Sequence, residues 1–353
     1  MINREQIINR STTLLEALDI MDKTDRRLLI VCDNVFFVGV ISIGDIQRAL
    51  LGKKDLSLPV TEYIRPDIMV STVDDDIDSV KEMMRKQRIE SMPIIDRDHK
   101  LVDVINWDDL FPEGNEEKDD KLNYPVVIMA GGKGTRLRPL TNIIPKPLIP
   151  VSDKTIIEDI MNSFKKVGCE SFFISVNYKR EMIEDYFLKK NEWDIKFVHE
   201  DVPLGTAGAL GFLKGRIKST FFVINCDTLV DLKISDVVEY HHANSNDITM
   251  VSVVKKMKIP YGTIETDVGG VVKQIREKPE FIYQINSGMY VLEPIAFEYI
   301  EENKHINFTE LVDRMIADGR KVGAFPVQER AWVDMGNWME YLKLVEKYSE
   351  GND

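Results

Sequence analysis

The sequence has little cysteine and no long apolar stretch. Its three cysteines, Cys32, Cys169 and Cys226, are far apart, odd in number and set in apolar surroundings. Reduced thiols in the core are therefore expected, rather than a disulfide framework or a cysteine metal site. No apolar run approaches the roughly 18 to 20 residues that span a bilayer. The N-terminal MINREQIINR also has no apolar core of the kind found in signal peptides. We expect a cytoplasmic protein that does not bind membranes.

Positive charge is scarce as well. The chain carries 46 basic and 59 acidic residues, a formal net charge of −13. Bulk charge of this sign argues against binding to nucleic acid or to an anionic membrane, so any phosphate site must be built locally. The length of 353 residues exceeds the usual size of one domain, which predicts a large domain together with a smaller module.

Residues 125–150, PVVIMAGGKGTRLRPLTNIIPKPLIP, join an apolar strand to a glycine-rich, cationic turn. The run 126–129 is typical of a parallel strand that is covered on both faces. Glycines let a ligand approach the backbone, whose N–H groups then point at phosphate oxygens. Arg136 and Lys146 add positive charge. We therefore predict a triphosphate site, with loop candidates Ala130, Gly131, Gly132, Gly134 and Thr135.

Two common phosphate loops do not fit this stretch. A Walker A loop needs Ser or Thr after Gly-Lys, but Lys133 is followed by Gly134, and a dinucleotide fingerprint needs a glycine where Leu137 stands. What remains, GGKGTRLRPLT followed by PKPL, resembles the signature of the sugar-1-phosphate nucleotidyltransferases, also called nucleotide-sugar pyrophosphorylases. The simpler interpretation is a solvated turn after a core strand.

Residues 1–115 contain an internal repeat with a shift of 64 positions. Segment 28–46 aligns without gaps on 92–110, and each copy follows an amphipathic pattern that predicts a helix, over about 13–22 and 77–88. This pair, with repeats over about 1–55 and 60–112 and GVISIGDI closing the first, resembles a tandem cystathionine-β-synthase-type (CBS) module. The polar, acidic stretch 113–124 is typical of a linker.

Resemblance to CBS modules implies an adenine nucleotide between the repeats, with Ser42 and Asp45 contacting its ribose. The second copy has Asp103 in place of the glycine and Asn106 in place of the hydroxyl residue, so we expect at most one working site. The competing interpretation is that Asp45 and Asp109 only cap helices.

From 126 onward, apolar strands alternate with helical patterns, which predicts an α/β fold: a doubly wound, mostly parallel, Rossmann-like sheet over 125–353. The expected strands are 126–130, 172–176, 195–199, 221–225, 248–254 and 287–292. Ligands of such sheets bind beyond the carboxyl ends of the strands. The polar residues at these ends are therefore the site candidates.

The third of these strands ends at His199 and Glu200, followed by DVPLGTAGAL. The family resemblance implies that this stretch, with Gly205 and Thr206, wraps the nucleobase. The two acceptor oxygens of Glu200 complement the N1–H and N2–H donors of guanine better than the single N3–H donor of thymine or uracil. GTP is therefore the favoured substrate. The alternative is that backbone groups read a pyrimidine while Glu200 faces solvent.

A magnesium site is expected from two aspartates. Asp227 directly follows the strand FFVIN, and Asp334 lies in AWVDMGNWMEY, which resembles the family's W-x-D-x-G motif with Asn337 in place of the more usual threonine. Mg²⁺ prefers a few carboxylate oxygens and keeps its waters and substrate phosphates. A capping aspartate is the alternative interpretation of Asp227.

Three further segments resemble the family's sugar side. PYGTIE places Gly262 where the family uses a backbone amide against a sugar hydroxyl, and REKPE supplies Glu277 as a hydroxyl acceptor and Lys278 as a grip on the sugar phosphate. INSGMYVL adds Asn286. Taken singly, each segment is compatible with an ordinary surface turn.

The resemblance implies that a nucleoside triphosphate and a hexose 1-phosphate give a nucleotide sugar and pyrophosphate. No general base is needed, because the second pKa of the attacking phosphate is about 6. Asp227 and Asp334 would hold Mg²⁺, while Arg136 binds the leaving phosphates, Lys146 the phosphates near the attack, and Lys278 the sugar phosphate.

Domain order and Glu200 are similar to those of the glucosamine-1-phosphate guanylyltransferases of legionaminic acid biosynthesis. The rival enzyme is a uridylyl- or thymidylyltransferase acting on glucose 1-phosphate. A rival of another class is a silent nucleotide sensor, which would be expected to lose the charged site residues that this chain keeps. Family members often associate, so a homo-oligomer is expected.

Overall fold

The computed structural model describes residues 6–24, 26–52, 54–64, 68–87, 89, 91–110, 121–151, 153–190, 192–336 and 338–350. The chain forms two compact units, Met1–Lys118 and Asp119–Asp353. Most of the predicted linker, and Asn337, lie outside the described residues. None of the described helices is both long enough and apolar enough to cross a membrane.

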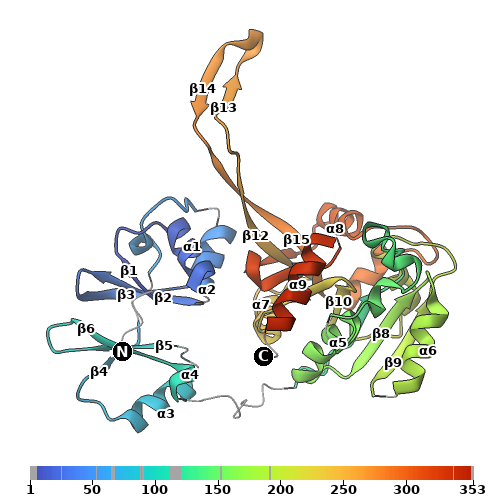
Figure 1. Cartoon of the computed structure of the whole chain (residues 1–353), viewed down its shortest axis with the longest axis horizontal. Helices are drawn as coiled ribbons and strands as arrows, with labels where there is room; N and C mark the ends of the chain where they lie inside the picture. Colours follow the sequence, from blue (N-terminus) through green and yellow to red (C-terminus); the bar gives the residue numbers. More distant parts are fainter. Residues whose placement is uncertain are drawn as a thin grey trace. The chain divides into compact units, whose positions relative to one another are not determined.

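The first unit contains the same supersecondary structure twice (Figure 1). In each repeat a short strand pairs in parallel with a hairpin whose two strands are antiparallel. The first repeat comprises β1 (Ile7–Asn9), α1 (Leu14–Thr24), β2 (Leu28–Asp33), β3 (Phe36–Ser42) and α2 (Ile43–Leu51). After a single 3₁₀ turn, η2 (Val60–Glu62), the second comprises β4 (Ser71–Thr72), α3 (Ile77–Gln87), β5 (Ser91–Ile95), β6 (Leu101–Asn106) and α4 (Trp107–Leu110).

Backbone hydrogen bonds join the two repeats. The amide of Phe37 donates to the carbonyl oxygen of His99 at 2.9 Å, and the amide of Leu101 donates to that of Val35 at 2.9 Å. The hairpin turn of one repeat therefore pairs with that of the other. This explains why the 64-residue repeat folds as one unit and not as two separate modules.

The second unit is built on a seven-stranded sheet in the order β16-β12-β15-β10-β7-β8-β9. Only β15 runs antiparallel to its neighbours. The strands are β7 (Val126–Met129), β8 (Ser171–Val176), β9 (Asp194–His199), β10 (Phe221–Asn225), β12 (Ile248–Lys258), β15 (Glu280–Leu292) and β16 (Val322–Gln328). All six expected strands are present, while β12 and β15 are longer than expected and β16 was not predicted.

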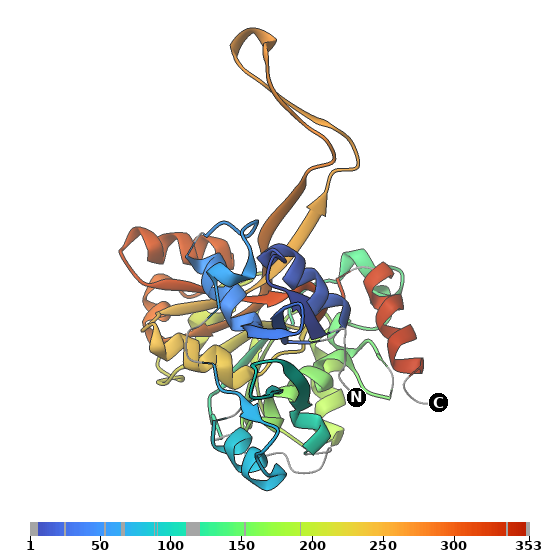
Figure 2. The same ribbon diagram turned by 90° about the vertical axis from the view of Figure 1, so that its left-hand side faces the viewer.

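Helices and 3₁₀ turns cover both faces of this sheet, as a doubly wound fold requires (Figures 1 and 2). The α-helices are α5 (Ile156–Lys166), α6 (Arg180–Lys190), α7 (Ile234–Ala243), α8 (Phe308–Ala317) and α9 (Trp338–Glu350). The 3₁₀ turns are η3 (Thr135–Leu137), η4 (Leu140–Asn142), η5 (Lys146–Leu148), η6 (Gly208–Leu213), η7 (Val268–Gly270), η8 (Pro294–Tyr299) and η9 (Glu329–Ala331).

Side chains of the central strands alternate between two hydrophobic cores. Val126 and Phe222 enter the core under α5 and α7, whereas Val127 and Phe221 enter the one under η6 and α8. All four are essentially inaccessible to solvent. This burial on both faces explains the continuous apolar runs in the sequence, because a strand with one solvated face would alternate with polar residues.

Two small ladders lie outside the main sheet. In the first, β11 (Thr228–Val230) pairs with β17 (Trp332–Asp334). In the second, β13 (Thr263–Thr266) pairs with β14 (Val272–Arg276) at the end of a long two-stranded arm that continues β12 and β15. The first ladder joins distant parts of the chain at the carboxyl edge of the sheet, and the arm projects from the body of the unit (Figure 1).

Candidate nucleotide and phosphate site

The glycine turn after β7 has backbone amides available for a ligand. Within the described residues, no amide from 131 to 134 donates a hydrogen bond to protein. Gly134 adopts a left-handed φ of 60°, and a Cβ there would lie 2.8 Å from Cγ2 of Thr141. A side chain at Gly132 would meet open space. The turn is therefore shaped by Gly134 and open at Gly132, as a phosphate cradle needs.

Side chains from two helical segments hold the remainder of this loop in place. Lys179 Nζ donates to the carbonyl oxygens of Asn142 and Ile143, each at 2.6 Å. Trp338 Nε1, at the start of α9, donates to the carbonyl oxygen of Arg138 at 3.0 Å. These contacts fix the backbone between the glycine turn and Lys146, which presets the positions of the two predicted cations.

Lys146 and Asp227 form a partly buried ion pair at the edge where β7 and β10 end. Lys146 Nζ contacts Asp227 Oδ2, and the two side chains are 9% and 18% exposed. Charges at such depth are costly to leave unpaired. Burial, assisted by the charge of Asp227, raises the pKa of the neighbouring Cys226 thiol to about 12, which disfavours the nucleophilic thiolate form. All three cysteines are buried free thiols, as expected.

Asp334 lies beside the same edge, held there by the ladder of β11 and β17. Asp334 pairs with Thr228 across this ladder, and the amide of Met335 donates to the carbonyl oxygen of Asp227 at 3.0 Å. The Arg136 guanidinium is close by, because a Cβ on Gly336 would lie 3.1 Å from its Nη2 and 2.7 Å from Asp334 Oδ1. The structure thus brings together Arg136, Lys146, Asp227 and Asp334, from segments almost 200 positions apart in sequence.

The donor set fits a divalent cation of the hard, oxygen-binding kind. Asp227 uses Oδ2 toward Lys146, and Asp334 Oδ1 accepts from the Gly336 amide at 2.7 Å. In the described part of the chain the other oxygen of each carboxylate has no protein partner. Two carboxylate oxygens beside an open phosphate loop are the usual protein share of a Mg²⁺ site.

Glu200 is buried next to the glycine turn and is engaged by protein. Its side chain accepts hydrogen bonds from Ser175 Oγ and, at 3.1 Å, from the amide of Leu204. A Cβ on Gly131 would lie 2.8 Å from Glu200 Oε1, so the glycine leaves room for this carboxylate. Glu200 thus lies against the nucleotide loop at 4% exposure, rather than facing solvent as the alternative interpretation assumed.

The segment after Glu200 is fixed to the start of α8. Gly205 has a φ of 80°, and a Cβ there would lie 2.6 Å from the carbonyl oxygen of Ile306. Thr206 Oγ1 accepts from the Phe308 amide at 2.9 Å. Both residues therefore have a structural role, and their predicted contact with the nucleobase stays a prediction.

Asn286 lies on a strand that is bonded to the small ladder of β11 and β17. The next residue, Ser287, accepts at its carbonyl oxygen from Thr228 Oγ1 at 3.0 Å and from Trp332 Nε1 at 3.1 Å, so it is tied to both strands of the small ladder. The exposed Asn286 amide donates to Tyr290 OH at 2.6 Å. Asn286 is thus the one predicted sugar residue whose strand is tied to the ladder that carries Asp334.

The other three predicted sugar residues are on the arm. A Cβ on Gly262 would lie 3.1 Å from Glu277 Oε2, so these two are neighbours. Glu277 and Lys278 are exposed and lie on the arm, between the end of β14 and the start of β15. Within one chain the structure therefore divides the predicted sugar residues into two groups.

Ser42 and Asp45 form the capping box of α2. Ser42 is the N-cap, its amide donates to Asp45 Oδ2 at 2.8 Å, and the amide of Asp45 donates back to Ser42 Oγ at 3.3 Å. A cavity of about 490 Å³ in the same unit is lined by other residues, namely Arg10, Phe37, Val38, Thr61, Ile64, Ile68, Val70 and His99. The N-cap is therefore Ser42 and not Asp45, which is the third helical residue of the capping box and also pairs with Arg48. Contact of either residue with a ribose stays a prediction.

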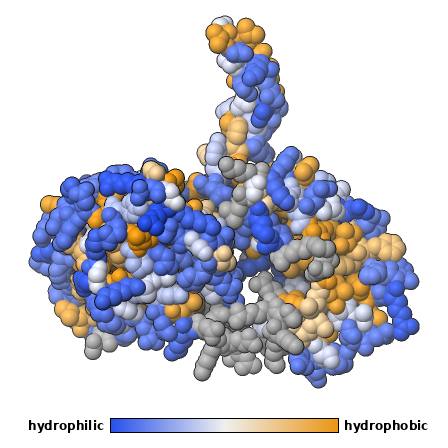
Figure 3. Space-filling view, turned by 180° about the vertical axis from the view of Figure 1, so that it is seen from behind, coloured by the Kyte–Doolittle hydropathy of each residue, from blue (hydrophilic) through white to orange (hydrophobic). Residues whose placement is uncertain are grey.

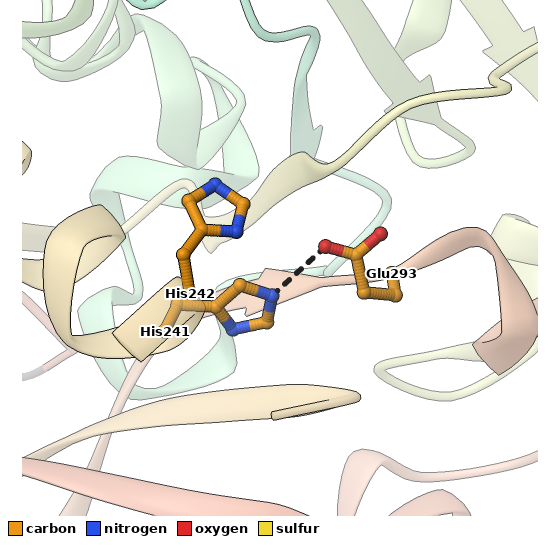
Figure 4. Close-up of side chains that lie close together, drawn as sticks. All are labelled: His241, His242 and Glu293. Atoms are coloured by element: carbon orange, nitrogen blue, oxygen red, sulfur yellow. Dashed lines mark hydrogen bonds and ion pairs between the residues drawn. The ribbon is translucent and has the colours of Figure 1, made fainter. Parts of the chain in front are cut away.

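His241, His242 and Glu293 form the one group of three potential metal ligands found among the described residues, with ligand atoms within 4.8 Å of one another (Figure 4). Hydrogen bonds already engage them: His241 contacts Thr249 Oγ1 at 2.8 Å and Glu293 Oε1 at 3.1 Å, and Tyr124 contacts His242 at 3.1 Å. Glu293 follows Leu292, which pairs with Phe221 at the start of β10. The group thus lies at the opposite edge of the sheet from Asp227, and we assign it a structural role.

Sequence reasoning missed the residues that position the site. Ser175 and Asn177, at the end of β8, hold Glu200 through its carboxylate and its backbone carbonyl oxygen. Thr228 and Trp332 hold the strand that carries Asn286. Ser175 and Asn177 could have been predicted from their position at the end of a strand, because ligands of parallel sheets bind beyond the carboxyl ends of the strands.

A mostly parallel sheet with an open glycine loop and paired carboxylates at its carboxyl edge defines a nucleotide-binding α/β protein. The chain belongs to the nucleotidyl transferase family, whose members match it over residues 125–351. Residues 1–52 and 60–113 each match the CBS domain. Both matches agree with the resemblances carried by the sequence motifs.

Relatives of known name match the second unit. A mannose-1-phosphate guanylyltransferase catalytic subunit beta of Drosophila pseudoobscura pseudoobscura is 32% identical over 225 residues, which are 62% of this chain and 60% of that protein. A UTP–glucose-1-phosphate uridylyltransferase of Synechocystis sp. is 27% identical over 241 residues, 62% of each. The chain thus spans about three fifths of the length of these curated relatives.

Among solved structures, HddC from Yersinia pseudotuberculosis is similar to this chain with a TM-score of 0.51 and 31% identity. The match covers 64% of this chain and 99% of HddC. The same protein in complex with GMP-PN matches with a TM-score of 0.50. The share of this chain that the match covers is close to that of residues 125–351, which match the nucleotidyl transferase family.

Proposed function

We propose that the protein transfers a nucleoside monophosphate from a nucleoside triphosphate to a hexose 1-phosphate, releasing pyrophosphate. The observation that carries this proposal is the meeting of Arg136, Lys146, Asp227 and Asp334 beside a glycine loop with available amides. Such a set holds and neutralises phosphates but offers no activated nucleophile. That combination suits phosphoryl chemistry in which the substrate itself supplies the attacking oxygen.

Each residue has a distinct part in this scheme. The loop amides and Arg136 bind the phosphates that leave, and Lys146 stabilises charge near the α-phosphorus, where the attack occurs in line. Asp227 and Asp334 would hold Mg²⁺, and the chemistry it would supply is charge neutralisation of the phosphates. The sugar phosphate needs no general base, because its second pKa of about 6 leaves it ionised at neutral pH.

GTP is the proposed donor. Support comes from relatives that are guanylyltransferases and from HddC, a structural neighbour that has been solved in complex with GMP-PN. Glu200 lies at the nucleotide loop, and each of its oxygens can accept more than the one hydrogen bond it receives from protein. The second candidate donor is UTP, which the name of the Synechocystis relative favours. Glu200→Gln should lower the preference for GTP over UTP if the carboxylate reads guanine.

Glucosamine 1-phosphate is the proposed acceptor, on the resemblance of the domain order to enzymes of legionaminic acid biosynthesis. The test is pyrophosphate release with Mg²⁺, each of the four nucleoside triphosphates, and glucosamine, N-acetylglucosamine, glucose and mannose 1-phosphates. We expect release with GTP and glucosamine 1-phosphate, its loss in Asp227→Asn, and its retention in the exposed control Asp231→Asn. Absence of release in every combination would instead favour a silent nucleotide sensor.

An adenine nucleotide is the proposed ligand of the CBS unit. The cavity of about 490 Å³ carries Arg10 and His99 beside apolar walls that suit a base and its phosphates. AMP, ADP or ATP should raise the thermal midpoint of the first unit in the full chain, and Arg10→Gln should reduce the shift. No shift with any of the three would leave the unit as a structural element.

We place the protein in the cytoplasm, because its cysteines are all free thiols.

A further inference from the structure

The two-stranded arm is almost entirely exposed. From Met257 to Lys278 every residue is exposed except Ile259 and Thr263, which are partly buried. The arm stands clear of the sheet that it extends (Figures 1 and 2). An isolated two-stranded hairpin is only marginally stable in water. A surface that packs against this arm would therefore stabilise it.

Much of the exposed surface of the arm is apolar. Val268 is 94% exposed and Tyr261 is 74% exposed, and other large apolar side chains at or above 53% are Met257, Ile264, Val271, Val272 and Ile275. Some of this apolar surface is visible toward the tip of the arm (Figure 3). So many large apolar side chains exposed on one short segment favour an interaction site.

The arm also carries Lys278 far from the carboxylates of its own chain. The ladder of β12 and β15 runs without a break from Ser252 opposite Asn286 to Lys258 opposite Glu280. The six residue steps from Asn286 to Glu280 span about 20 Å at about 3.4 Å per step, and Lys278 lies further out. A lysine stem of four carbons bridges only about 6 Å. Lys278 therefore does not reach the Asp227 edge of the chain to which it belongs.

Asn286, in contrast, lies on a strand that is tied to the ladder carrying Asp334, through the bonds of Ser287 to Thr228 and Trp332. One chain therefore presents the nucleotide half of a site together with Asn286, and separately presents Gly262, Glu277 and Lys278 on an arm. The group at the sheet edge, called the half-site below, has no lysine for the sugar phosphate. Lys278 on the arm has no nucleotide residues of its own chain beside it.

We propose that the arm of one copy of this chain enters the site of a second copy and supplies Glu277 and Lys278 there. This inference rests on the function proposed above, which assigns the sugar phosphate to Lys278. A reciprocal exchange gives a closed two-fold dimer with two composite sites. It also covers the apolar surface of each arm and brings a cation to each sugar phosphate. The acceptor side of each site is then formed by two chains.

Subunit mixing tests the exchange through activity. Asp227→Asn and Lys278→Ala chains carry different tags, are produced together, and the mixed dimer is isolated by both tags. Each variant alone should lose turnover on the order of 100-fold at limiting sugar phosphate. The mixed dimer pairs an intact half-site with an intact arm once, so it should recover about half of the wild-type turnover.

A mixed dimer as inactive as its parents, or a wild-type chain that sediments only as a monomer, would overturn the exchange. Asp334→Asn replaces Asp227→Asn if that variant does not fold, because its carboxylate lies in the same half-site. Lys273→Ala on the arm serves as the matched control for Lys278→Ala, since both lysines are exposed and only Lys278 is assigned to substrate.

A second readout needs no activity, and so separates this inference from the proposed function. One tagged chain carries Lys278→Cys and the other Asn286→Cys, and a short thiol cross-linker is added. The native thiols are buried, and burial raises the pKa of Cys169 to about 11 and that of Cys226 to about 12, so they should not react.

The exchange predicts a link between chains that requires both new cysteines. It also predicts no link within a chain that carries the two together when it is diluted as a monomer. A link within one chain would overturn the exchange. Inter-chain linking of the two cysteine variants, together with a wild-type chain that forms no nucleotide sugar, would keep the exchange and reject the proposed function.

Discussion

At the scale of single residues, the partly buried pair of Lys146 and Asp227 is central to the proposed chemistry. Each side chain stabilises the other in the absence of substrate, since both are largely withdrawn from water. Substrate phosphates and a divalent cation offer each partner a stronger ligand of opposite charge. The pair thus holds two groups in position that must later act on different atoms.

Removing the Lys146 charge tests this assignment. Lys146→Ala should lower turnover on the order of 100-fold, by the size of effect seen when one donor to a developing charge is lost. Lys146→Arg should retain part of the rate because it keeps the charge. Steady-state kinetics decides the matter, with the exposed Lys154→Ala as the control. A loss of only a few fold in Lys146→Ala would contradict the assignment.

His241 makes stability depend on pH. Burial lowers the pKa of its imidazole, an effect that Glu293 opposes and His242 reinforces. The unfolded chain binds a proton at a pKa of about 6.5, whereas the folded chain resists it. The free energy of unfolding should therefore be full above that pH and should fall as pH drops below it.

Urea unfolding at a series of pH values between about 7.5 and 5.5 measures this loss. His241→Gln should be less stable at high pH but should show a shallower decline. An equally steep decline in the variant would show that other groups cause the acid sensitivity.

At the scale of elements, the close approach of β15 to the end of β10 depends on Gly288. Its φ is 89°, and a Cβ there would lie 2.5 Å from Asn225 Nδ2 and 3.0 Å from Thr228 Oγ1. Gly319 also has a positive φ, 75°, but a Cβ there would meet nothing within 4 Å. A side chain at either position would strain the backbone, but only a side chain at position 288 would also be crowded by its neighbours.

Comparison of Gly288→Ala with Gly319→Ala separates these causes. Gly288→Ala should reduce the free energy of unfolding by about 1 to 3 kcal/mol more than Gly319→Ala, because overpacking adds to the strain. Chemical denaturation gives both values. Equal losses would mean that Asn225 and Thr228 move aside without cost.

The sequence predicted the elements whose signals are local. Continuous apolar runs located the central strands because both their faces are buried, and the 64-residue repeat located the first unit. The strand β16, with Pro326 inside it, was missed because a proline inside a run argues against a strand. The ladder of β11 and β17 has three residues in each strand, so tertiary pairing rather than local pattern defines it.

Residue identity also predicted one half of the site better than the other. Asp227 lies at a strand end, as the strand-end rule expects. Arg136 and Lys146, predicted from the glycine-rich stretch, and Asp334, predicted from its motif, meet it there. The path of the chain between residues 257 and 280 could not be derived from its sequence, because each of its segments is also compatible with an ordinary surface turn. Whether a hairpin folds over its own sheet or projects from it depends on packing that no local pattern encodes.

At the scale of the whole molecule, the two units have separate cores, and every residue assigned to the transfer reaction lies in the second. Residues 119–353 alone should therefore fold and catalyse the reaction, without a response to adenine nucleotides. Circular dichroism checks the fold and pyrophosphate release checks the activity. A folded but inactive fragment would show that the first unit contributes to catalysis itself.

The most direct measurement of the central claim follows the α-phosphorus. GTP labelled at that atom is incubated with glucosamine 1-phosphate, Mg²⁺ and the full chain, and the products are separated. The proposal predicts label in a guanosine diphosphate sugar, unlabelled pyrophosphate in equal amount, and neither product with Asp227→Asn. If no labelled nucleotide sugar forms with any triphosphate and hexose 1-phosphate pair, the proposed transfer reaction is wrong.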